Sequence, residues 1–172
     1  CAPAHRPLQQ SLGTASNIPN EQVMSQFDVL NDDFRRRGAG ANDDPVGADI
    51  LIEFYPAELD PDGNALDEPG INRFNGGQAF WGEADIEEDL KPSTIWDPDR
   101  YFNIWVLEFG GDLDGVLGYA QFPSMSGLDG LFEDEGAAST DGVVVGYQYF
   151  GTTGNVQAPF DGGRTTTHEV GH

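Results

Sequence analysis

The sequence is poor in positive charge, in cysteine and in long apolar runs. Eight lysine and arginine residues, of which only Lys91 is a lysine, stand against 30 acidic residues, and the formal net charge is −22. Such a field repels nucleic acids and anionic membrane surfaces, so we expect neither as a partner. The single cysteine, Cys1, cannot form an internal disulfide. No apolar run is long enough to predict a membrane span.

The first 19 residues predict an irregular leader. Residues 1–19 contain proline, glutamine and serine without a clear period. The chain starts at Cys1 and not at methionine, which indicates a fragment or a processed form, and no secretory signal pattern is visible. A cysteine at the start of a mature chain is also a site for lipid attachment, so lipid anchoring through Cys1 stays open as an alternative.

The first predicted helix covers residues 20–37. Asn20 is a capping residue, and Gly38 follows the last turn. The arginines at 35–37 are expected to face the negative end of the helix dipole and not to form a basic binding patch. An apolar stripe at helical spacing predicts the buried face, and it consists of Val23, Phe27, Leu30 and Phe34.

Several short runs predict strands. Residues 48–55, 101–109 and 142–150 are rich in β-branched and aromatic side chains, which is typical of buried strands. A weaker strand is predicted at 116–122, and an internal glycine and a following proline favour an edge position for it. A short helical piece is predicted around 84–90, and a final helix opens near 165–167. This order predicts an α/β domain with a mixed sheet.

The sequence HEVGH at residues 168–172 contains two of the three histidines of the chain. On a helix, His168 and His172 would lie on one face, close enough to bind one metal ion. Glu169 would lie beside that ion, where it can accept a proton from a zinc-activated water and pass it to the leaving amine. The pattern predicts a Zn²⁺ site of a metalloprotease, and a solvated polar helix start is the alternative.

Two histidines do not complete a catalytic zinc site, which has three protein ligands and one open position. The remaining histidine, His5, lies in the leader, and no carboxylate is singled out by its spacing. We therefore expect the third ligand beyond residue 172. The 172-residue chain alone is expected to bind zinc weakly and to be inactive.

The stretch GRTTTHEVGH resembles the first half of the extended metzincin motif H-E-x-x-H-x-x-G-x-x-H. More specifically, the chain resembles the pappalysin family of metzincin metalloendopeptidases. The resemblance includes EQVMSQFDVLNDDFRR (21–36), WDPDRYFNIWVLEFGGDLDGVLGYAQFP (96–123) and TDGVVVGYQYFGTTG (140–154). The loops between these segments match poorly.

This resemblance implies that residues 20–172 form the N-terminal, upper part of a catalytic domain. The implied fold is a twisted, mostly parallel five-stranded sheet with a backing helix and an active-site helix. His168 and His172 match the first two zinc ligands, and Glu169 matches the general base. The strand at 116–122 matches an antiparallel edge strand to which an extended substrate adds as a further strand. The substrate-binding positions along it are Gly118, Tyr119, Ala120 and Gln121.

The chain also departs from the family. The third histidine, the glycine before it and the methionine turn would all follow residue 172. The family has an apolar strand before its backing helix, where this chain has CAPAHRPLQQSL. That strand would lie between those at 48–55 and 101–109, so its loss is expected to leave strand edges unpaired and the chain prone to aggregation. Some members block the zinc with a propeptide cysteine, but no such motif surrounds Cys1.

The sequence thus predicts a secreted, acidic zinc metalloendopeptidase that hydrolyses extended peptides or proteins. One alternative is a non-catalytic acidic extracellular module in which HEVGH is incidental. Another is a zinc peptidase of a different clan, whose third ligand would be a glutamate on a later helix. A Gly-x-x-His sequence after residue 172 would favour the metzincin hypothesis over both.

Overall fold

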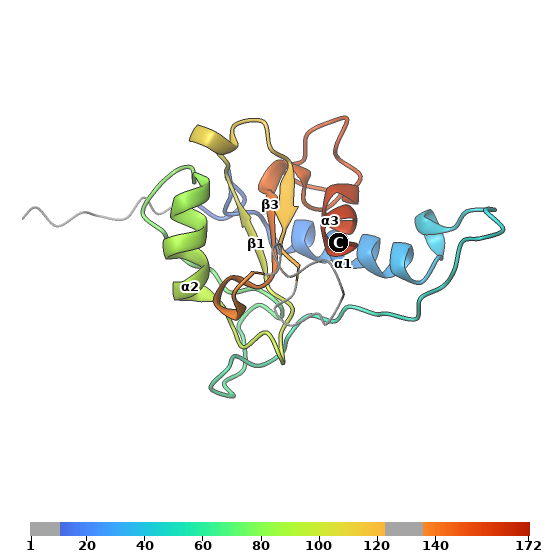
Figure 1. Ribbon diagram of the computed structural model, residues 1–172, viewed down its shortest axis with the longest axis horizontal. Helices are drawn as coiled ribbons and strands as arrows, with labels where there is room; N and C mark the ends of the chain where they lie inside the picture. The colour runs from blue at the N-terminus through green and yellow to red at the C-terminus, as the bar shows by residue number, and fades with distance from the viewer. Residues whose placement is uncertain (1–10, 123–135) are drawn as a thin grey trace, which may run out of the picture.

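A computed structural model describes residues 11–122 and 136–172 as a small sheet between helices (Figure 1). The helix that precedes the sheet in the chain is longer than the one that follows it. A further helical stretch lies between these two helices in the sequence. It begins with a π-type helix at Asp85–Leu90 and continues directly into α2 (Lys91–Thr94). In chain order the elements are α1 (Asn20–Phe34), α2 (Lys91–Thr94), β1 (Ile104–Leu107), β2 (Gly118–Ala120), β3 (Val143–Gly146) and α3 (Arg164–Val170).

The sheet is mixed, with the strand order β1-β3-β2. β1 runs parallel to β3, with Ile104 opposite Val143, and β2 runs antiparallel to it, with Tyr119 opposite Val144. All four residues of β3 are buried, as expected for a central strand. The α/β fold class and the edge position of β2 are thus confirmed. The described residues form three strands of the five that the family resemblance implies.

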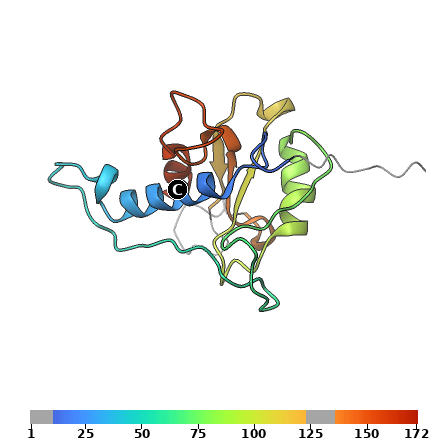
Figure 2. The same cartoon turned by 180° about the vertical axis from the view of Figure 1, so that it is seen from behind.

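Helices cover both faces of this sheet (Figures 1 and 2). On one face, Val143 and Val145 of β3 pack with Val23 of α1 and with Val170 of α3. On the other face, Val144 packs with Ile86 and Leu90 of the π-type and α2 stretch. The period of two along β3 therefore divides the apolar core into two layers.

The ends of α1 differ from the prediction. Pro19 occupies the N-cap position and no side chain caps the helix, so Asn20 is the first helical residue and not the cap. The helix ends at Phe34, which places the arginines at 35–37 beyond its last turn. Arg35 instead forms ion pairs with Asp49 and Glu53. Nearby acidic side chains therefore determine where this arginine lies, more than the helix dipole does.

The strand predicted at 48–55 is wrong. This segment has no strand, and Ile50, Leu51 and Ile52 are 51%, 72% and 47% exposed. The Asn31 side chain donates to Phe54 O at 3.0 Å and accepts from Phe54 N at 2.7 Å, which holds the segment at the end of α1. A strand needs a neighbour for its backbone groups, and among the described residues no strand lies beside this segment.

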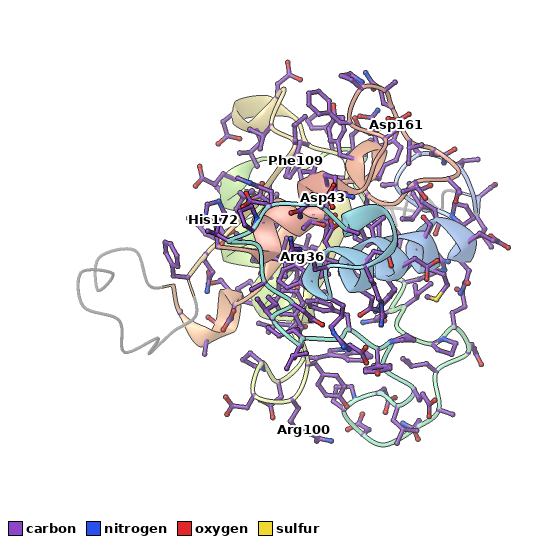
Figure 3. The ribbon with its side chains drawn as sticks, turned by 90° about the vertical axis from the view of Figure 1, so that its right-hand side faces the viewer. Arg36, Asp43, Arg100, Phe109, Asp161 and His172 are labelled. Atoms are coloured by element: carbon purple, nitrogen blue, oxygen red, sulfur yellow. The ribbon has the colours of Figure 1, made fainter. Side chains whose placement is uncertain are left out.

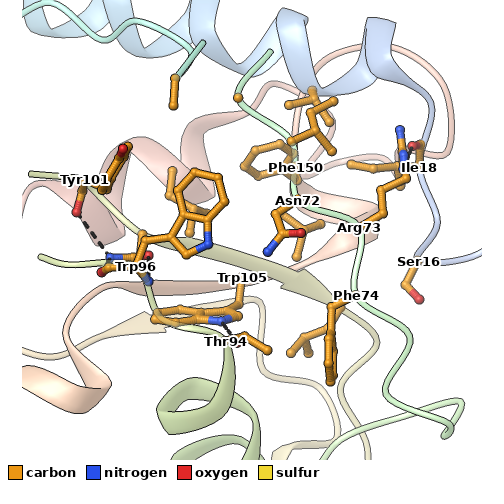
Figure 4. Close-up of a pocket in the computed structure, with 18 of the residues that line it drawn as sticks. Ser16, Ile18, Asn72, Arg73, Phe74, Thr94, Trp96, Tyr101, Trp105 and Phe150 are labelled. Atoms are coloured by element: carbon orange, nitrogen blue, oxygen red, sulfur yellow. Dashed lines mark hydrogen bonds between the residues drawn. The ribbon is translucent and has the colours of Figure 1, made fainter. Parts of the chain in front are cut away.

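A cavity of about 690 Å³ lies beside β1 (Figure 4). Among the described strands, β1 pairs only with β3, so its other edge has no strand partner there. The cavity is lined by apolar and aromatic side chains that include Phe74, Trp105 and Phe150. The sequence predicted unpaired strand edges, and among the described strands the outer edge of β1 is one of them, next to this cavity.

Candidate active site

The helix α3 carries the first three residues of the HEVGH sequence, Gly171 is its C-cap, and His172 follows the helix. The helix is preceded by Gly163, which has a left-handed backbone with φ 68°. A Cβ at this position would lie 3.1 Å from Gln26 Oε1 and 3.1 Å from Val29 Cγ2, so a side chain would be both strained and crowded. Glycine at 163 therefore allows α3 to start directly against α1.

His168 in α3 and His172 just after it are both exposed, and His172 is labelled in Figure 3. Their Nε2 atoms are 3.2 Å apart, and the rings are nearly perpendicular, at 88°. Two Zn–N bonds of the usual length at a tetrahedral angle place the nitrogens about 3.4 Å apart. The pair therefore has the spacing of two ligands of one zinc ion. The same spacing also suits a hydrogen bond between two neutral imidazoles.

A third protein ligand is not found in the described part of the chain. There, no group of three or more histidine, cysteine, aspartate or glutamate side chains is placed to hold a metal ion. His5 and Cys1 lie outside the described residues. The described residues thus bring together two imidazole nitrogens, which fit a zinc site only in part.

Glu169 lies between the histidines in sequence and faces the sheet edge. Its side chain is half-buried, and its Cγ would be 3.1 Å from a Cβ built on Gly118 of β2. At the far end of β2, the Phe122 ring packs edge-on against His172, with centroids 6.4 Å apart. The edge strand therefore runs along the side of α3 on which these residues lie.

A buried amide holds α3 in this position. Gln26 of α1 is 1% exposed. Its Oε1 accepts from Thr166 Oγ1 at 3.0 Å and from Gly151 N at 2.7 Å, and its Nε2 donates to Gly163 O at 3.0 Å. Buried polar groups without partners are unfavourable, so this satisfied amide fixes the start of α3 relative to α1.

A buried carboxylate makes a second link between the helices. Asp33 of α1 has a side chain that is 6% exposed, and its Oδ1 lies 3.1 Å from Arg164 Nη2. Its Oδ2 accepts from Thr167 Oγ1 at 2.7 Å. Thr167 immediately precedes His168, so the link fixes the helix next to the candidate zinc ligand.

The loop between β3 and α3 is fixed by Gln22, one turn before Gln26. Its Nε2 donates to Tyr147 O and Phe150 O, both at 2.9 Å, and its Oε1 accepts from Asn155 N at 2.8 Å. Sequence reasoning missed these supporting residues. Their position could have identified them: Gln22 and Gln26 lie on the same helix face as Val23, and polar side chains on a buried face need hydrogen-bond partners.

The four predicted substrate-binding residues lie on or next to β2. Gly146 N donates to Leu117 O at 2.9 Å. Because narrow and wide pairs alternate in an antiparallel ladder, Tyr119 is the next residue whose backbone faces β3. The backbone groups of Gly118 and Ala120 then face away from the sheet. The Gln121 side chain is held by Ala137 O at 3.1 Å and by Thr140 Oγ1 at 2.7 Å.

Comparisons with known proteins give matches among solved structures. No protein-family model matches the chain, and no curated protein does. Mature mirolysin of Tannerella forsythia in complex with a cleaved peptide is 38% identical, with a TM-score of 0.73 over 91% of this chain and 56% of that one. Mirolysin in complex with compound 9 is 38% identical over the same shares, with a TM-score of 0.70. A Tannerella forsythia promirolysin mutant is 37% identical, with a TM-score of 0.70 over 92% and 50%.

The chain spans about half the length of these proteins, 56% of the first two and 50% of the third. In residues 11–122 and 136–172, no helix is long and apolar enough to cross a membrane. The chain is therefore similar in sequence and fold to mirolysin, a metzincin-type metalloprotease, which confirms the metzincin level of the predicted resemblance but not the pappalysin subfamily.

Proposed function

We propose that residues 20–172 are the N-terminal part of the catalytic domain of a zinc metalloendopeptidase, a metzincin of the pappalysin family. The observation that carries this proposal is the pair of His168 and His172 Nε2 atoms, 3.2 Å apart at the C-terminal end of α3, with Glu169 next to the edge strand β2. The similarity to mirolysin over 91% of the chain supports it.

In this proposal His168 and His172 hold the zinc ion, and a third ligand follows residue 172. Bound zinc would polarise the scissile carbonyl and make water a nucleophile near neutral pH. Asp33 and Gln26 hold α3 against α1, so the helix that carries His168 has a fixed position. Ligands held in this way need little rearrangement when the metal binds.

Glu169 is the proposed general base. Its carboxylate would accept a proton from the attacking water and donate it to the nitrogen of the leaving amine. The residue follows a proposed zinc ligand directly, and its Cγ lies next to Gly118 of β2, the strand along which the substrate is proposed to bind.

The proposed substrate is an extended peptide that pairs with β2. Backbone groups of Gly118 and Ala120 face away from β3, so they are available to a further strand. Gln121 follows β2 and its side chain bonds to Ala137 and Thr140, while the Tyr119 side chain points to the opposite face of the sheet from Glu169. An extended substrate bound there would pass Glu169 and the two histidines.

The proposed location is outside the cytoplasm. The resemblance to a family of secreted proteases supports this location, and a net charge of −22 argues against binding to anionic surfaces. Lipid attachment through Cys1 stays an untested alternative, because that residue lies outside the described part of the chain.

The proposal is tested by measuring zinc content and peptide hydrolysis for two forms of the protein. One form is this 172-residue chain, and the other is the native protein that continues past His172. We expect the longer form to bind about one zinc ion and to cleave peptides, and the short form to do neither well. If the folded longer form binds no zinc, HEVGH is incidental and the acidic-module hypothesis replaces the protease.

A methyl group at Gly118 should disturb the site. The added Cβ would lie 3.0 Å from Val144 O and 3.1 Å from Glu169 Cγ. Because the backbone of the central strand cannot move easily, Glu169 is displaced. In the longer protein we expect Gly118→Ala to lower kcat/KM roughly 10-fold.

The control for this substitution is Gly162→Ala. At Gly162 the nearest atom to an added Cβ is Arg164 Cγ at 3.8 Å, an ordinary contact. Equal kcat/KM values for the two variants would contradict the close approach of Glu169 to β2.

A further inference from the structure

The sheet face opposite the candidate site buries a charged side chain. Lys91, the first residue of α2, is 0% exposed. A buried ammonium group is unfavourable unless it is paired. Its Nζ lies 2.6 Å from Glu87 Oε1, one helical turn earlier. It also lies 4.9 Å from the ring centroid of Tyr119 and 5.5 Å from that of Trp105.

Glu87 links this lysine to the edge strand. The same Oε1 atom accepts a hydrogen bond from Tyr119 Oη at 2.7 Å. Burial, together with the hydrogen bond to Glu87, raises the pKa of Tyr119, so its hydroxyl stays protonated and acts as the donor. We call Lys91, Glu87 and the Tyr119 hydroxyl the α2 anchor.

The α2 anchor acts on the middle residue of β2. Side chains alternate along a strand, so Tyr119 packs in the α2 layer while Gly118 faces Glu169 on the other side. Among the described strands β2 pairs only with β3, over three residues, and its first residue is a glycine, which has no side chain to pack. The tyrosine thus attaches a short, weakly held strand to a second element.

We infer that the α2 anchor sets the position of β2 and thereby the affinity of the site for extended peptides. This inference rests on the proposed function, in which the backbone of Gly118 and Ala120 pairs with substrate. Main-chain hydrogen bonds tolerate little change in distance or angle, so a shift of β2 weakens several of them at once. The groups of the anchor lie on the far face of the sheet. They are positioning residues for substrate and do not contact the reacting atoms.

The test removes one hydroxyl group. In the longer, zinc-loaded protein, Tyr119→Phe keeps the ring but loses the hydrogen bond to Glu87. We expect KM for an extended peptide to rise about 3- to 10-fold, while kcat and zinc content stay unchanged. Because KM is not always a dissociation constant, Kd for the same peptide is also measured by fluorescence anisotropy in a Glu169→Ala background, and it should rise by the same factor.

Two comparisons separate positioning from a general loss of stability. Tyr101→Phe removes another hydroxyl, which donates to Asp60 O at 3.3 Å far from β2, and should leave KM and Kd unchanged. A minimal substrate too short to reach along β2 should show the same KM with and without Tyr119→Phe.

Each outcome decides the inference. Unchanged KM and Kd for the extended peptide in Tyr119→Phe, or a fall in kcat together with zinc loss, would overturn it. If the unsubstituted longer protein neither cleaves nor binds the peptide, the proposed function fails and the inference fails with it. If the unsubstituted protein cleaves the peptide normally and Tyr119→Phe leaves KM and Kd unchanged, only the inference about the α2 anchor fails and the proposed function stands.

Discussion

Replacing Glu169 with alanine in the longer protein is expected to lower kcat by about 10²- to 10⁴-fold, the usual contribution of a positioned general base. In the proposal the metal ligands are the His168 and His172 imidazoles, whose Nε2 atoms are 3.2 Å apart, so removal of the Glu169 carboxylate should leave them in place. Metal analysis should still find about one zinc ion per molecule. Steady-state hydrolysis of an extended peptide and metal content are measured on the same preparation.

A matched substitution shows whether this effect is specific. Glu88→Ala removes an exposed carboxylate from the π-type stretch on the opposite sheet face, and it should change kcat less than twofold. Retention of more than a tenth of the activity by Glu169→Ala would remove Glu169 from the proposed chemistry. Loss of zinc together with activity would assign it a role in metal binding instead.

The second large effect is expected from Gln26→Leu. Leucine has nearly the same size as glutamine, so the change mainly removes hydrogen bonds. Gly151 N and Gly163 O lose the partner that they have inside the core. Each unsatisfied buried group is destabilising, and we expect the free energy of unfolding to fall by about 2–5 kcal/mol. Urea denaturation of the longer protein, followed by tryptophan fluorescence, measures it.

The control is a glutamine at the surface. Gln78 is exposed and makes only a long 3.5 Å contact with Asp85, so Gln78→Leu should change stability by no more than about 0.5 kcal/mol. A similar small change in both variants would show that the buried amide does not hold α3 in place.

The elements that the sequence predicted best are those whose structure follows from the composition of their own residues. Val143–Val145 form a run of β-branched side chains, and they become the central strand. The stripe that contains Val23 and Leu30 lies on the buried face of α1. The predicted edge position of 116–122 followed from Gly118 and the proline after the strand, and β2 is indeed an edge strand. Local composition was sufficient in these cases.

The segment 48–55 shows where local composition is insufficient. Its apolar run is typical of a strand, yet a strand also needs a neighbour to pair with. The described residues place Asn31 against it instead, and no strand lies beside it. Whether such a run is buried therefore depends on chain that lies far away in the sequence.

The candidate site also combines residues that local sequence identifies with residues that depend on distant contacts. The sequence could propose His168, Glu169 and His172 because their spacing is a local property, and the structure brings the two imidazoles together. Gln26 could not, because its partner Gly163 is 137 residues away. Glu87 and Tyr119 are likewise 32 residues apart, and nothing in either segment indicates the other. The motif predicts which side chains meet a ligand, whereas the residues that position them depend on the tertiary fold.

The burial of Lys91 also determines the reactivity of this part of the protein. It carries the only side-chain amine among the 172 residues, and that amine is enclosed by Glu87 and two aromatic rings. The positive charge on the surface of the described chain is therefore carried by guanidinium groups. Amine-selective reagents reach no side-chain target until the sheet and α2 separate, so acylation at Lys91 reports on opening of the fold and not on its surface.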